Sequence, residues 1–237
     1  MSSKSSSTAA SCSALDSPGA LIFLHGLGDT PAGWSELEYS LPQMQSSLSK
    51  LRYVFPPAPT ISITINGGAQ MPGWFDLYDW PIGITAKDDP KGLDSSVQQI
   101  HQVVQDVVTK HGIPKNRIVI GGFSQGGAIA LLAAYEKTEN QDDDCFAGCV
   151  ALSGWLTKTN DLQISEKAAQ QTPLFWGHGQ FDDKVLFEQQ AHGIAKLTEL
   201  GVQNIQSDEY PMGHSSHPKE LQTMASFIQS VLFGNTA

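Results

Sequence analysis

The chain has 237 residues, with 14 basic and 24 acidic side chains and a formal net charge of −10 at pH 7. This length fits a single large α/β domain with a substantial core. The acidic balance argues against nucleic-acid binding, which needs basic patches to replace counterions, and against a general electrostatic attraction to anionic membranes.

The first 18 residues form a serine-rich tail, and residues 19–237 have the composition of one folded domain. The tail lacks the apolar segment of a secretory signal and is too polar to bury a core, so we predict that it is disordered. No window reaches the roughly 18 apolar residues of a membrane span. Cys12, Cys145 and Cys149 have no metal or redox spacing and are typical of reduced thiols in a cytoplasmic protein.

Strand-like and helix-like segments alternate along the domain. This order predicts an α/β fold with a mainly parallel central sheet covered by helices on both faces. The predicted strands are 20–24, 51–55, 117–121, 146–152, 173–177 and 203–210. The predicted helices are 33–48 (interrupted at Pro42), 93–111, 125–137, 185–200 and 217–232.

The segment 56–91 is too long for an ordinary connection and is rich in aromatic side chains, which favours a lid over a disordered insertion. An apolar lid suits a groove for an acyl chain. The alternative is a segment that only closes the hydrophobic core. The predicted groove residues are Met71, Trp74 and Phe75, with Trp155 and Leu156 beyond the strand 146–152.

A nucleophile elbow is the strongest functional signal. Ser124 lies between Gly122 and Gly126, directly after a strand-like run and directly before a run of helix formers. The two glycines permit a turn so tight that the serine hydroxyl is exposed at the end of the sheet. The pattern therefore predicts Ser124 as a catalytic nucleophile.

A serine hydroxyl is a weak nucleophile, so it needs a base and an acid, and after this elbow the acid precedes the histidine in the chain. The turn that follows the strand 173–177 carries Asp182 and Asp183. Adjacent side chains on a turn point in different directions, so one of the two reaches the base. The residues themselves do not decide between them.

The base is expected in the loop 211–217, which follows the last predicted strand. We favour His214 over His217, because His217 lies where the loop becomes a helix and a cap or surface role suits it better. His178 precedes the acid in the chain, which inverts the expected order, and a role in supporting the turn suits it better.

Two backbone N–H groups are expected to bind the oxyanion. One is the amide of Gln125, the residue after the nucleophile, at the start of a helix whose dipole also attracts negative charge. The other is the amide of Leu27, which lies between Gly26 and Gly28 in the loop after the strand 20–24. We expect no cofactor and no metal.

Five segments together resemble the acyl-protein thioesterase family, the phospholipase and carboxylesterase group of α/β-hydrolases, and the similarity extends from about residue 19 to about residue 233. They are residues 24–30, 71–76, 121–127, 178–182 and 213–216. The resemblance implies an α/β-hydrolase fold, with a plant member expected, and hydrolysis of long-chain acyl thioesters on protein cysteines, with activity on lysophospholipids and small esters. It also favours Asp182 over Asp183, because the family's acid is the third residue after its His-Gly pair.

We therefore expect a serine hydrolase with S-acylated proteins or small acyl esters as substrates, a cytoplasmic location with peripheral membrane contact, and no nucleic-acid partner. A weak homodimer stays open. Two alternatives remain: a short-chain carboxylesterase or deacetylase, and a non-catalytic ligand receptor on the same scaffold, since fold alone does not define function. Acyl-chain preference tests the first alternative, and labelling by a serine-directed probe tests the second.

Overall fold

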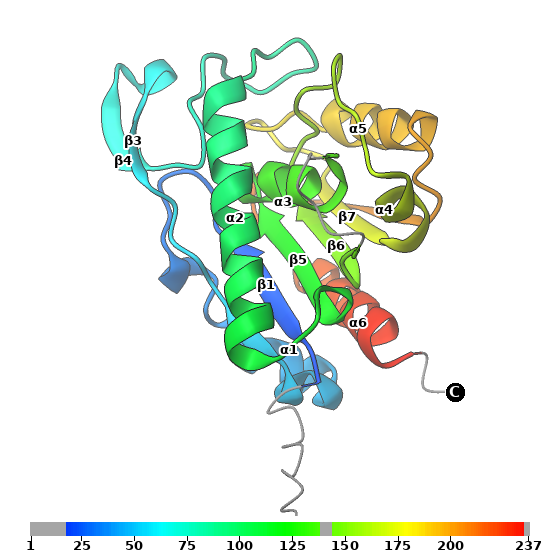
Figure 1. Cartoon of the computed structure of the whole chain (residues 1–237). Helices are drawn as coiled ribbons and strands as arrows, with labels where there is room; N and C mark the ends of the chain where they lie inside the picture. The colour runs from blue at the N-terminus through cyan, green and yellow to red at the C-terminus, as the bar shows by residue number, and fades with distance from the viewer. Residues whose placement is uncertain (1–17, 138–143, 235–237) are drawn as a thin grey trace, which may run out of the picture.

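The computed structural model describes residues 18–137 and 144–234. Its central sheet has six strands in the order β2-β1-β5-β6-β7-β8, and all neighbours pair in parallel (Figure 1). The strands are β1 (Ala20–Leu24), β2 (Arg52–Val54), β5 (Ile118–Phe123), β6 (Gly148–Leu152), β7 (Leu174–Gly179) and β8 (Ile205–Tyr210). Each overlaps a predicted strand, and the predicted α/β-hydrolase fold class is confirmed.

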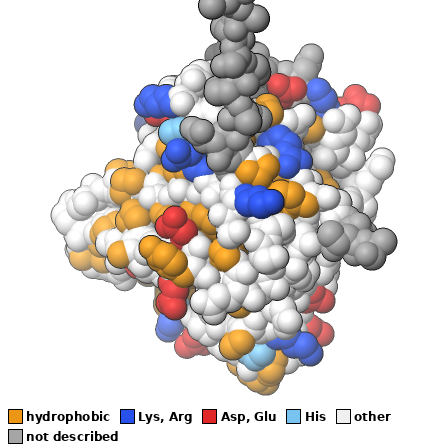
Figure 2. Space-filling model, turned by 90° about the horizontal axis from the view of Figure 1, so that it is seen from below, with side chains coloured by type: hydrophobic (Ala, Val, Ile, Leu, Met, Phe, Trp, Pro, Cys, Tyr) orange, Lys and Arg blue, Asp and Glu red, His pale blue; other side chains and the backbone are white. Residues whose placement is uncertain are grey.

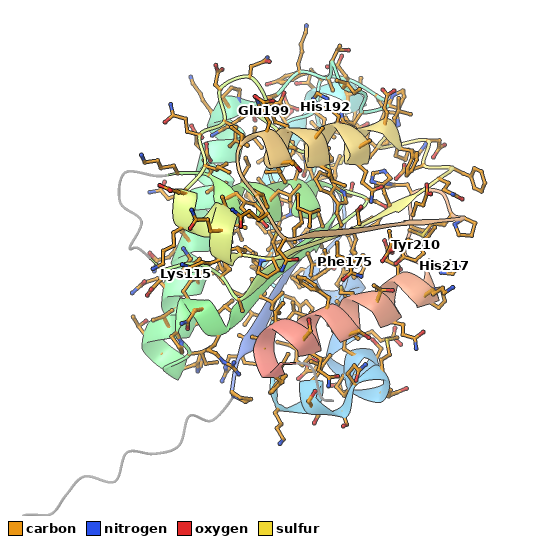
Figure 3. All side chains as sticks on the ribbon, turned by 90° about the vertical axis from the view of Figure 1, so that its right-hand side faces the viewer. Lys115, Phe175, His192, Glu199, Tyr210 and His217 are labelled. Atoms are coloured by element: carbon orange, nitrogen blue, oxygen red, sulfur yellow. The ribbon has the colours of Figure 1, made fainter. Side chains whose placement is uncertain are left out.

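Helices cover both faces of the sheet, which is why the inner strands β1, β5 and β6 are buried along almost their whole length. In β1, Ile22 and Leu24 point into one core cluster, whereas Leu21 and Phe23 point into the other. The first face is covered by α2 (Pro90–His111), α3 (Gln125–Tyr135), α4 (Glu166–Gln171) and α5 (Glu188–Glu199), and the second by α1 (Leu37–Met44) and α6 (Pro218–Phe233). Figure 3 shows this layering from the side, with α5 above the sheet and α6 below it.

Helix α3 fixes the position of the predicted nucleophile, because it begins at the residue after Ser124. Every residue of α3 is buried, between the sheet and α2. A helix that is apolar on all sides is stable only inside a core, and each fully buried Leu or Ile side chain contributes about 1.5–3 kcal/mol. The nucleophile is therefore held by the most deeply buried helix of the fold.

The lid predicted over 56–91 is not confirmed as a loop. The segment contains an antiparallel hairpin of β3 (Thr60–Ile63) and β4 (Ala69–Pro72), which turns through Gly67 and Gly68 at φ values of 66° and 80°. In Figure 1 the hairpin projects from the left of the molecule, and Figure 2 shows hydrophobic side chains gathered on that same side. The alternation of Ile61, Ile63 and Ile65 with polar residues is a pattern typical of a strand, although glycines and prolines surround it.

The predicted helices differ from the observed ones in two places. The predicted helix 33–48 is divided into a 3₁₀ turn (Pro31–Gly33), α1 and a second 3₁₀ turn (Ser46–Lys50). Helix α4 is absent from the predicted helices, although Ser165 caps it by accepting a hydrogen bond from the amide of Ala168. A serine followed by good helix formers is the signal that could have identified it.

Two predictions concern the ends of the chain and membrane insertion. The predicted disordered tail falls on residues 1–17, which lie outside the described residues, and on Pro18. Among the helices of the two described ranges, none combines the length and the hydrophobicity needed to cross a bilayer.

Candidate active site

Ser124 occupies the turn between β5 and α3 with φ 54° and ψ −122°, a conformation that side-chain-bearing residues rarely adopt. Its amide donates a hydrogen bond to the carbonyl of Leu152 on β6, 2.9 Å away. Two glycines make the turn sterically possible. A Cβ atom on Gly126 would lie 2.3 Å from the carbonyl oxygen of Leu24, and one on Gly122 would lie 2.3 Å from the carbonyl carbon of Gly126.

Gly126→Ala should destabilise the protein by about 3 kcal/mol, because the backbone of β1 and the elbow would have to move apart. Urea unfolding monitored by circular dichroism measures this effect. Gly83→Ala is the matched control, since its Cβ would meet Leu186 at an ordinary 3.5 Å. Equal stability of the two variants would contradict the close backbone approach at Gly126.

The structure brings the side chains of Ser124, His214 and Asp182 together in one hydrogen-bonded row. His214 Nε2 lies 2.8 Å from Ser124 Oγ, and His214 Nδ1 lies 2.7 Å from Asp182 Oδ2. The other carboxylate oxygen, Oδ1, accepts hydrogen bonds from the amides of Lys184 and Val185, both at 2.9 Å. The three residues come from loops at the carboxyl ends of β5, β7 and β8, where parallel sheets place their sites.

Asp182 is suited to remain ionised beside His214. Burial by itself would raise the pKa of Asp182, but the hydrogen bond and charge of His214 and the amides of Lys184 and Val185 outweigh it, and the pKa is lowered from 3.8. Asp183 differs completely: its side chain is exposed and lies 3.3 Å from the ammonium group of Lys184. The geometry thus separates two carboxylates that physical reasoning on the sequence leaves equivalent.

His217 is turned to a capping role. Its side chain accepts a hydrogen bond from the amide of Lys219, and Glu220 reaches back to the amide of His217, which completes a capping box at the start of α6. The ring of His217 also stacks on Tyr210, with centroids 5.6 Å apart. Figure 3 shows these two side chains together beside the first turn of α6.

A cavity of about 260 Å³ opens beside Ser124 and His214. Both predicted oxyanion residues, Leu27 and Gln125, line it. Gln125 is the first residue of α3, so its amide has no acceptor within the helix and faces outward with the positive end of the helix dipole. The remaining lining residues are Gly26, Asp29, Leu77, Trp80, Phe123, Trp155, Lys184 and Val185.

Trp155 is the one predicted groove residue that lines this cavity; Met71, Trp74, Phe75 and Leu156 are not among the lining residues. Trp74 and Phe75 are almost completely buried in the core instead. Leu77 and Trp80 line the cavity where Trp74 and Phe75 were predicted. Both belong to the same apolar stretch of the sequence, but a pattern without coordinates does not say which of its members turn toward the cavity.

The side chain of Gln125 has a role that sequence reasoning missed. Its Oε1 accepts a hydrogen bond from the amide of Trp74 at 2.8 Å, and its Nε2 donates to the carbonyl of Phe75 at 2.6 Å. Trp74 Nε1 in turn donates to the carbonyl of His25, 2.8 Å away. The segment after the hairpin is therefore tied both to the nucleophile elbow and to the loop that carries Leu27.

Comparison with known proteins agrees with this site. Residues 7–232 match the family model described as Phospholipase/Carboxylesterase. Acyl-protein thioesterase 1 of Debaryomyces hansenii is 39% identical over 221 residues, covering 90% of this chain and 91% of that protein. Acyl-protein thioesterase 1 of Saccharomyces cerevisiae is 38% identical over 219 residues, covering 90% of this chain and 92% of that protein.

Solved structures give the same result. Acyl-protein thioesterase 2 of Zea mays superposes with a TM-score of 0.78 at 30% identity, covering 90% of this chain and 94% of that one. SOBER1 of Arabidopsis thaliana superposes with a TM-score of 0.77 at 30% identity, covering 90% of this chain and 99% of that one. The chain therefore belongs to the phospholipase/carboxylesterase family of α/β-hydrolases and is a serine hydrolase.

Proposed function

We propose that this protein hydrolyses acyl thioesters and esters, with Ser124 as nucleophile, His214 as base and Asp182 as the acid that orients His214. Its main substrates are S-acylated proteins, and it also has carboxylesterase and lysophospholipase activity. The observation that carries the proposal is the unbroken row of hydrogen bonds from Asp182 through His214 to Ser124, and Ser124 borders an apolar cavity. Similarity to acyl-protein thioesterases supports the choice of substrate.

The chemistry follows from the positions of the protons. His214 Nε2 accepts the Ser124 proton as Oγ attacks the acyl carbonyl carbon, and Asp182 stabilises the resulting imidazolium. The amides of Leu27 and Gln125 stabilise the negative charge on the carbonyl oxygen. His214 then protonates the leaving thiol or alcohol. Water, with His214 again as base, attacks the acyl-enzyme and releases the fatty acid.

The acyl chain is proposed to lie against Leu77, Trp80 and Trp155, the apolar wall of the cavity. Burial of one methylene contributes about 0.8 kcal/mol, which is about fourfold in kcat/KM per methylene. The cavity volume of about 260 Å³ lies just below the range of roughly 300–1,000 Å³ that is usual for ligand sites. This size keeps a short-chain carboxylesterase as the second candidate.

On p-nitrophenyl esters, kcat/KM should rise by up to about 4,000-fold from acetate to octanoate, because the six added methylenes leave water, and it should not fall again at palmitate. Trp80→Ala should reduce the octanoate-to-acetate ratio about tenfold, since about two methylenes would no longer be covered by the indole ring. Phe181→Ala is the control: Phe181 is 70% exposed and is absent from the cavity wall. A steep decline with chain length would instead identify the short-chain carboxylesterase.

The same assay extends to the proposed natural substrate. An S-palmitoylated peptide anchored in phosphatidylcholine liposomes should lose its acyl group, as expected for a cytoplasmic enzyme that contacts membranes peripherally. The exposed aromatic side chains of Trp80 and Phe181 support such a contact. A fluorophosphonate probe should label Ser124, whereas a receptor without a working triad would not react.

A further inference from the structure

His178 is a buried titratable residue that the mechanism above does not use. It lies on β7, four residues before Asp182, and its side chain is completely buried. Its Nε2 lies 2.9 Å from the carbonyl oxygen of Val185 and 3.5 Å from Oδ2 of Asp182. A carbonyl oxygen is only an acceptor, so Nε2 carries the hydrogen and donates it.

The surroundings keep His178 neutral. Its Nδ1 is buried and has no hydrogen-bond partner among the described residues, so a second proton there would be a buried, unpaired donor. Burial is the largest effect and lowers the pKa of His178, assisted by the charge of His214, while the bond to Val185 and the charge of Asp182 act in the opposite direction. A neutral ring beside Asp182 does not cancel the charge of the carboxylate, and that charge stays available to His214.

Val185 links the two residues. Its carbonyl accepts from His178, and its amide donates to Oδ1 of Asp182. The imidazole N–H therefore fixes the peptide whose amide holds Oδ1, and Nε2 itself lies 3.5 Å from Oδ2. We propose that His178 is a positioning residue for the acid of the triad: by binding the carbonyl of Val185, whose amide holds Oδ1, it keeps the Asp182 carboxylate in the orientation in which Oδ2 receives Nδ1–H of His214. This inference rests on the proposed function.

The alternative is a merely structural role in the turn. The turn has other supports, since the amide of Ile82 donates to the carbonyl of Lys184 at 2.7 Å and the amide of Leu186 donates to the carbonyl of Ile82 at 3.0 Å. Removal of the His178 donor is thus expected to change the carboxylate more than the course of the chain. A kinetic signature separates the two roles.

His178→Phe keeps a buried ring without the donor, and His178→Gln places an amide nitrogen near the position of Nε2. For His178→Phe we expect kcat to fall about 10- to 100-fold, because small displacements of a catalytic group are costly, with little change in KM. The acid limb of kcat/KM should move to lower pH, since a carboxylate that has turned away gives less support to the His214 imidazolium. His178→Gln should restore most of kcat and the position of the limb.

Double-mutant analysis with Asp182→Asn decides whether His178 acts through Asp182. If it does, adding His178→Phe to Asp182→Asn lowers kcat almost no further. If the decreases in kcat of the two single variants multiply in the double variant, the inference is overturned. If Asp182→Asn is inactive but His178→Phe matches wild type, the inference alone is wrong. If Asp182→Asn keeps full activity, the proposed function itself fails.

Two further variants complete the experiment. His101→Phe is the matched control, because His101 is a partly buried histidine on α2 that contacts the carbonyl of Ala133 at 3.2 Å, and it should keep the kcat and pH profile of wild type. His178→Asn is a second variant without a donor at the Nε2 position, should His178→Phe not fold. An unchanged acid limb in folded His178→Phe or His178→Asn would overturn the positioning role.

Discussion

Ser124→Ala will reduce kcat about 10⁴- to 10⁶-fold, because the reaction loses its nucleophile and retains only the oxyanion donors and substrate binding. The melting temperature should stay close to that of wild type. The alanine keeps the Cβ atom and therefore the same strained backbone, and the substitution removes the hydrogen bond between Ser124 Oγ and His214. Hydrolysis of p-nitrophenyl octanoate and labelling by a fluorophosphonate probe measure the effect.

Ser153→Ala is the matched control for this variant. Ser153 is also buried, also follows a strand of the sheet and also has a positive φ, of 46°, but it does not line the cavity. It should keep wild-type turnover. Retention of most activity by Ser124→Ala, or equally low activity in both variants, would exclude Ser124 as the nucleophile.

A second substitution at the same position tests the strain of the elbow. The backbone of Ser124 lies at φ 54° and ψ −122°, which costs a side-chain-bearing residue about 1–3 kcal/mol. Glycine adopts this conformation freely, but it also gains entropy in the unfolded chain, worth about 0.5–1 kcal/mol. Ser124→Gly should therefore be about 1 kcal/mol more stable than Ser124→Ala, and equally inactive.

The sequence is most informative where local chemistry decides the structure. The glycines around Ser124 and the strand and helix beside it dictate the elbow, because little else permits that backbone. Short continuous apolar runs identify the inner strands of the sheet, since buried parallel strands are covered on both faces. His217 behaves as a helix cap, as its place between loop and helix indicates.

What the sequence does not provide depends on contacts between distant segments. The hydrogen bond between the Gln125 side chain and the amide of Trp74 joins residues far apart in the chain, and a glutamine beside a nucleophile gives no sequence signal of such a contact. The same limit explains why the sequence favours Phe75 at the cavity, whereas the structure places it in the core. Aromatic residues near a site suit either location, and only packing decides between them.

Asp182→Asn will reduce kcat about 10³- to 10⁴-fold while leaving the fold in place. The asparagine has nearly the same shape, and its oxygen still accepts from the amides of Lys184 and Val185. Its NH₂ group then faces His214 Nδ1, which must become an acceptor. The proton moves to Nε2, the atom that has to receive the Ser124 proton, and general-base catalysis is blocked.

The matched control for Asp182→Asn is Asp183→Asn, whose carboxylate is exposed and contacts only the Lys184 ammonium among the ion pairs of the described residues. It should keep wild-type kcat.

Stability provides an independent check on Asp182. Its folded pKa is lowered from 3.8, so the charged carboxylate stabilises the fold above that pH, and this contribution disappears as the pH falls through the folded value. Asp182→Asn should thus be less stable than wild type at pH 7, by urea unfolding, and the difference should shrink in acid. A constant difference across this range would show that the Asp182 charge is not held by His214 and the turn amides.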